Sequence, residues 1–154
     1  MENESTVPKS AQGKAWSWTN KKPNNIIPID TDWDMDFFKW WCVFLRPFVP
    51  LTNREIDVMA CFLKHRWELS KVTADPAALD ILLMSEETKR KVIEECGITL
   101  QHFYVVMSNL RKNKVILGNI INPKLIPNMR KDDNGTFQLL VLFKEKDAFK
   151  NRQV

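Results

Sequence analysis

The sequence has few of the residues, and none of the motifs, by which enzymes are commonly recognised. Its 154 residues include four glycines and two histidines. They form no glycine-rich phosphate loop and no dinucleotide-binding turn. The GxSxG pattern of hydrolases and the HExxH pattern of metalloproteases are absent as well. We therefore expect a non-enzymatic protein with no catalytic residues and no cofactor.

The three cysteines lack the CxxC spacing of zinc-binding or redox motifs. Cys42, Cys61 and Cys96 each lie in an apolar stretch of helical character, so we interpret them as buried thiols in a reducing compartment. We interpret His65 and His102 as surface residues that are isolated from each other and from the cysteines. The sequence therefore predicts neither a disulfide nor a metal site.

Long apolar runs are also missing. No stretch approaches the roughly 18 apolar residues of a membrane span, and the N-terminal segment MENESTVPKSAQGK has no apolar signal core. We therefore expect an intracellular protein with no membrane partner. The net charge is +4, and residues 97–154 carry ten basic and four acidic side chains. A positive C-terminal third suits a phosphate backbone or an acidic protein surface, and it does not choose between them.

Aromatic residues, in contrast, are plentiful: there are six tryptophans and nine phenylalanines, concentrated in the first 67 residues. Residues 1–50 are predicted to form an extended N-terminal arm that includes a short aromatic helix over 34–45, DMDFFKWWCVFL. The apolar residues of this helix surround it on all sides, so it needs cover from more than one direction. Trp16 and Trp18 are costly in a solvated tail, and such residues normally dock onto another surface.

Residues 51–144 are predicted to form a winged helix-turn-helix domain, followed by a charged tail over 145–154. Thr52 and Glu55 can form a capping box at the start of the first helix, and Gly97 separates two later helices by a short turn. Segments 115–117, 120–121 and 137–143 resemble strands of a β-ribbon. The predicted fold class is α+β, mostly α. The helix after Gly97 is expected to bury one face made of Leu100, Phe103, Met107 and Leu110.

Three long stretches resemble small proteins encoded by crAss-like and related phages of Bacteroides-type gut bacteria. They are TNKKPNNIIPIDTDWDMDFFKWW, LTNREIDVMACFLKHRWELSK and ITLQHFYVVMSNLRKNKVILGNIINPKLIP. Phages of that kind have short tails built on a portal with stacked connector rings. The resemblance implies a virion protein, and a ring or connector subunit is the leading hypothesis. The INPKLIP segment also resembles the wing strand of winged-helix plasmid replication proteins.

The leading interpretation is thus a structural subunit of the head-to-tail assembly that docks through its aromatic arm. Its partners would be the portal and neighbouring ring or tail subunits, with the chain itself forming a homo-oligomeric ring. Its location would be the virion, assembled in the host cytoplasm. The expected partner-contacting residues are Trp16, Trp18, Ile26, Ile27, Trp33, Phe37, Phe38, Trp40 and Trp41.

The alternative is a winged-helix DNA-binding regulator of transcription or replication in the host cytoplasm. In such proteins the second helix of the helix-turn-helix enters the major groove, where Gln and Asn can read adenine and basic residues contact phosphate. The candidate residues are Gln101, His102, Asn109, Arg111, Lys112, Lys114, Arg130 and Lys131. A third interpretation is a free cytosolic protein whose arm folds back over its own domain.

Overall fold

The structure is a computed structural model that describes residues 27–32, 36–129, 137, 139 and 143–146. The chain divides into two units: Ile29–Pro127, and Met1–Pro28 together with Asn128–Val154. The few described residues of the second unit form no helix or strand. Most of the predicted strand over 137–143 lies outside the described residues, as do the predicted contact residues Trp16, Trp18, Ile26, Trp33, Arg130 and Lys131.

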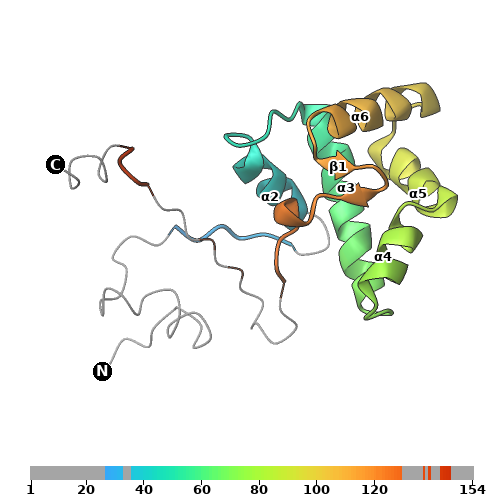
Figure 1. The fold of residues 1–154 in the computed structure, drawn as a ribbon, viewed down its shortest axis with the longest axis horizontal. Helices are drawn as coiled ribbons and strands as arrows, with labels where there is room; N and C mark the ends of the chain where they lie inside the picture. The colour runs from blue at the N-terminus through green and yellow to red at the C-terminus, as the bar shows by residue number, and fades with distance from the viewer. Residues whose placement is uncertain (1–26, 33–35, 130–136, 138, 140–142, 147–154) are drawn as a thin grey trace. The chain divides into compact units, whose positions relative to one another are not determined.

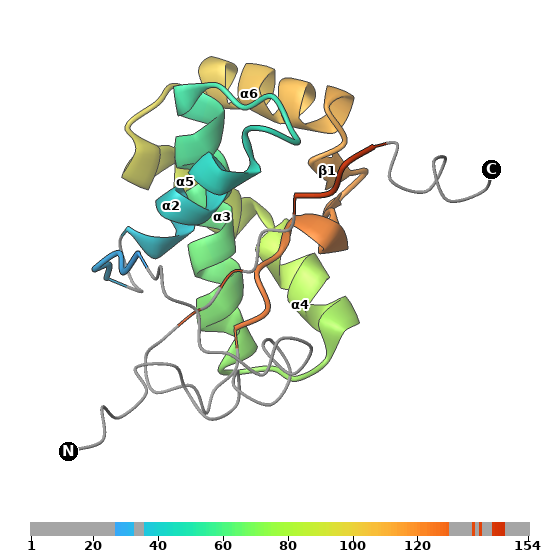
Figure 2. The ribbon, with the colours of Figure 1, turned by 90° about the vertical axis from the view of Figure 1, so that its left-hand side faces the viewer.

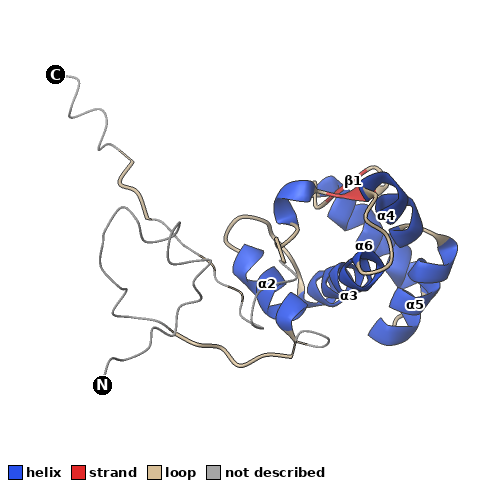
Figure 3. Cartoon of the chain, turned by 90° about the horizontal axis from the view of Figure 1, so that it is seen from below, coloured by secondary structure: helices blue, strands red, loops and turns tan. Residues whose placement is uncertain are grey.

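Helix α3 (Asn53–Ser70) is the centre of the Ile29–Pro127 unit, and α2, α4, α5 and α6 all pack against it. Figure 3 shows α3 in the middle of the other helices. The predicted capping box at its start is confirmed: the Thr52 hydroxyl accepts from the Glu55 backbone N–H, and the Glu55 carboxylate accepts from the Thr52 N–H. Because α3 is surrounded, its central turns are almost wholly buried, including Val58, Met59 and Phe62.

Helices α4 (Pro76–Leu83), α5 (Glu86–Cys96) and α6 (Leu100–Lys112) follow, and the last two are the helices predicted on either side of Gly97. Ser85 caps α5 through the Thr88 N–H, and Thr99 caps α6 through the His102 N–H. Between these helices Gly97 takes the left-handed conformation, with φ 61°. Helices α5 and α6 are therefore joined by a short turn, as predicted (Figure 1), while the winged-helix arrangement stays a prediction.

A small antiparallel hairpin follows α6. Strands β1 (Ile116–Leu117) and β2 (Ile120–Ile121) pair Ile116 with Ile121, and Gly118 turns the chain with φ 67°. A short 3-10 helix, η1 (Pro123–Leu125), comes next. Among the described residues the sheet has these two strands only. The described residues are therefore α+β and mostly α. The first two segments of the predicted ribbon form the hairpin, and most of the third, 137–143, lies outside the described residues.

Helix α2 (Phe37–Leu45) belongs to the same unit as α3 and packs along it (Figure 2). The Phe38 and Trp67 rings lie 6.2 Å apart, and Lys39 forms an ion pair of 3.7 Å with Asp57. The Trp41 indole N–H donates to the Leu125 carbonyl at 2.8 Å. The aromatic helix is therefore built into the helical unit. No helix among the described residues is long and apolar enough to cross a membrane.

Candidate functional site

Helix α2 has one buried side and one exposed apolar side. Phe37, Phe38, Cys42 and Leu45 are buried. Trp40, Val43 and Phe44 lie three and four positions apart, and each remains more than 40% exposed; Phe48, in the turn after the helix, is 78% exposed. We call these last four residues the α2 face. Exposed apolar residues grouped in this way are typical of a contact surface.

The α2 face corrects the predicted partner contacts. Phe38 is 2% exposed and Phe37 is also buried, so both belong to the core of the chain and are closed to a partner. Trp41 is half-buried, and its indole N–H is already bonded to Leu125. Trp40 and Ile27 are exposed as expected. The reason for the error is that an all-round apolar helix does not reveal which side its own domain covers.

The outer face of α6 is the second candidate surface. Gln101, His102, Asn109, Arg111 and Lys112 are exposed, as the helical projection predicted, and so is Lys114 beyond the end of the helix. The same face also exposes Leu100, Tyr104 and Val105. The prediction that Leu100 is buried is therefore wrong. Because Leu100 is the first residue of α6, it lies at the edge of the packed face, and Val106 is buried instead.

The positive charge of this face is modest. Arg111 directs its Nε to the Gly118 carbonyl at 3.1 Å, which ties α6 to the hairpin turn. Lys112 and Lys114 are the neighbouring cations of the described segment, and Lys124 is exposed on η1. Non-specific affinity for nucleic acid grows with the number of phosphates neutralised. The described part of this surface therefore supports weak rather than strong backbone binding.

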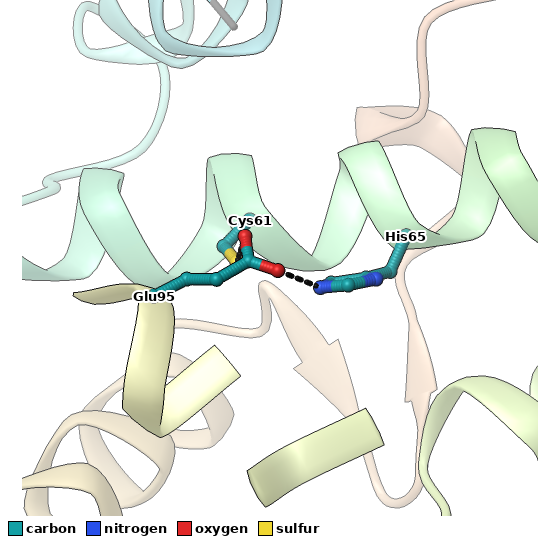
Figure 4. A group of neighbouring side chains, drawn as sticks. All are labelled: Cys61, His65 and Glu95. Carbon is teal, nitrogen blue, oxygen red and sulfur yellow. Dashed lines mark hydrogen bonds and ion pairs between the residues drawn. The ribbon is translucent and has the colours of Figure 1, made fainter. Parts of the chain in front are cut away.

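A polar cluster lies between α3 and α5. Cys61 and His65 extend from α3, four residues apart, and meet Glu95 from α5 (Figure 4). His65 Nε2 lies 2.9 Å from Glu95 Oε1, and the Cys61 thiol donates to Glu95 Oε2 at 3.2 Å. The three ligand-type atoms all lie within 4.8 Å of one another. Lys64 forms an ion pair with Glu95 Oε2 from the exposed side of the cluster.

These contacts shift the pKa values of the cluster. Burial alone would raise the pKa of Glu95, but hydrogen bonds from Lys64 and Cys61 and the charge of His65 bring that pKa below its usual value. The hydrogen bond with Cys96, together with burial, raises the pKa of the Cys61 thiol strongly. The same bond from Cys61 lowers the pKa of Cys96. Cys61 is thus a protonated thiol, which is the opposite of an activated nucleophile.

The cluster overturns the prediction that His65 is an isolated surface residue. Its side chain is only 17% exposed and lies within ligand distance of Cys61. The signal was present in the sequence, because residues four apart on a helix share one face, and Cys61 and His65 have that spacing. Glu95 had no such signal, since it comes from another helix 30 residues later in the chain. His102 is exposed, as expected.

Comparisons with protein-family models, with curated proteins and with solved structures found no match.

Proposed function

We propose that the protein is a non-enzymatic structural subunit that associates with further copies of itself through the α2 face. In keeping with the resemblance to small phage proteins, we infer that the assembly is a connector ring of a phage virion. The observation that carries the proposal is the exposed apolar side of α2, formed by Trp40, Val43, Phe44 and Phe48.

The exposed surfaces favour a second copy of the chain as the partner that covers the α2 face. A closed ring requires two different surfaces on each subunit, one meeting the other on the next copy. The α2 face offers one apolar surface, and the exposed Leu100, Tyr104 and Val105 of α6 offer a different one. Both surfaces carry aromatic residues, which supply most of the binding energy at protein interfaces.

The binding free energy of this contact can be estimated from the side-chain surface of the α2 face that is still exposed and that a partner could bury. A fully buried aromatic anchor contributes about 2 kcal/mol or more to binding. Trp40 and Phe44 are each already more than half covered by their own domain, so about 1 kcal/mol each is a reasonable contribution. Loss of both anchors therefore corresponds to about a 30-fold weaker association.

The test uses two differently tagged copies of the full chain that are expressed together. We expect the wild-type copies to purify as one complex, and the Trp40→Ser plus Phe44→Ser variant to weaken their association by at least about 30-fold. The matched control is Val72→Ser plus Ile81→Ser, which also removes two exposed apolar residues but lies outside the α2 face. The control should associate as the wild type does. Equal association of all three proteins would remove the α2 face from the proposal.

DNA binding is the second candidate function, and the exposed Gln101, Asn109 and Lys112 on the second helix of a helix-turn-helix favour it. Arg111 is a poor test residue because its substitution would also release the hairpin. Asn109→Ala plus Lys112→Ala is the cleaner variant. If the wild type shifts duplex DNA in a salt-sensitive way and this variant does not, while tagged copies fail to associate, DNA binding replaces the assembly proposal.

A further inference from the structure

The cluster of Cys61, His65 and Glu95 differs from an ordinary ion pair in its composition. It brings a thiol, an imidazole and a carboxylate to one place from two helices. His65 Nε2 is buried from solvent, yet it makes no hydrogen bond of acceptable geometry, although it lies 2.9 Å from Glu95 Oε1. The nitrogen is therefore close to the carboxylate without being aligned with it.

We propose that Cys61, His65 and Glu95 bind a divalent zinc ion that bridges α3 and α5. Sulfur, nitrogen and oxygen donors of these types are the ligands that zinc takes in proteins. Two of the three ligands lie four residues apart on one helix, a spacing that places both side chains on the same face.

The spacing of the donor atoms fits one ion. Zinc bonds of about 2.0 Å to nitrogen and oxygen and about 2.3 Å to sulfur place tetrahedral neighbours roughly 3.3 to 3.6 Å apart. The His65 nitrogen and the Cys61 sulfur lie 2.9 Å and 3.2 Å from the two Glu95 oxygens. The two contacts to Glu95 must therefore lengthen by a few tenths of an ångström, while the Cys61 sulfur and the His65 nitrogen, which lie within 4.8 Å of each other, take up tetrahedral spacing around the ion.

Positive charge leaves the site when the ion enters, including any proton on His65 Nε2, because zinc binds the neutral imidazole. The Cys61 thiol releases its proton to solvent, because only the thiolate binds zinc. Lys64 loses its contact with Glu95, and its side chain, which is 29% exposed, can turn toward water. The thiolate and the carboxylate then balance the charge of the ion. Cys96 does not complete the set: its thiol is shared between Cys61 and the Asp57 carbonyl, and its sulfur is not among the donor atoms that lie within 4.8 Å of one another, so solvent fills the fourth position.

The test titrates cobalt, a spectroscopic substitute for zinc, into the untagged and metal-free full chain. We expect a near-ultraviolet band from sulfur-to-cobalt charge transfer, which zinc then abolishes by displacement. Cys61→Ser should remove the band, and His65→Ala and Glu95→Gln should each weaken cobalt binding at least about tenfold. Zinc should also raise the melting temperature of the wild type, because it binds the folded form.

The matched controls are His102→Ala and Glu94→Gln, which change an exposed histidine and an exposed glutamate outside the cluster. Both should bind cobalt as the wild type does. Glu95→Gln keeps the test decisive if Cys61→Ser does not fold. Because the Glu95 side chain is 40% exposed, we expect the Glu95→Gln variant to fold, and circular dichroism can verify this. The assignment is overturned if the wild type gives no charge-transfer band, or if Glu95→Gln and His65→Ala bind cobalt as tightly as the controls.

Discussion

At the scale of single residues, Trp41 shows how a side chain can serve the fold rather than an interface. Its ring is half-buried, and its indole N–H donates to the carbonyl of Leu125, 84 positions later in the chain. Its neighbour Trp40 is 44% exposed. Two adjacent tryptophans therefore have different tasks, one in holding α2 to the turn of η1 and one on the α2 face.

The Trp41→Phe substitution tests this assignment. It keeps an aromatic ring but removes the N–H, which leaves the Leu125 carbonyl without this donor. The free energy of unfolding should fall by about 1 kcal/mol, the usual net contribution of such a hydrogen bond. Urea denaturation followed by circular dichroism measures the change. Trp40→Phe is the matched control, and an equal loss in both variants would show that the indole N–H of Trp41 has no special part.

At the scale of elements, the turn between α5 and α6 depends on the backbone of one glycine. Gly97 ends α5 with φ 61°, a conformation that favours glycine, and no atom stands within 4 Å of the place where a Cβ would be. A substitution here is therefore strained by the backbone alone, without a steric clash.

We expect Gly97→Ala to lower the free energy of unfolding by about 1 to 2 kcal/mol, the cost of the left-handed conformation for a residue with a Cβ. Gly97→Asn should recover part of the loss, because asparagine tolerates this conformation better. The exposed helical change Glu94→Ala is the control. Thermal unfolding of the four proteins ranks them, and a Gly97→Ala variant as stable as the wild type would mean that the turn adopts another conformation.

The sequence predicted best those helix ends that are set by residues close to them in the chain. The capping box of Thr52 and Glu55 and the glycine stop at Gly97 each lie within a few residues of the helix end that they define. What could not be predicted depends on partners far along the chain. The exposed side of α2 is decided by how it packs on α3, and the Glu95 contacts join two helices that local patterns treat separately.

At the scale of the whole molecule, the unit from Ile29 to Pro127 is organised around α3 and still leaves apolar surface uncovered on α2 and α6. A monomer that works alone gains nothing from exposing Trp40, Phe44 and Phe48. The proposed association would bury them, and this is the basis of the proposed ring subunit.

The most direct test of the proposed assembly is the mass of the untagged full chain in solution, measured by sedimentation velocity over a concentration series. We predict a discrete species whose mass is a multiple of the 18.1 kDa of one chain and whose share grows with concentration. The Trp40→Ser plus Phe44→Ser variant should form this species only at about 30-fold higher concentration. A wild type that sediments as one 18.1 kDa chain at every concentration contradicts self-association through the α2 face.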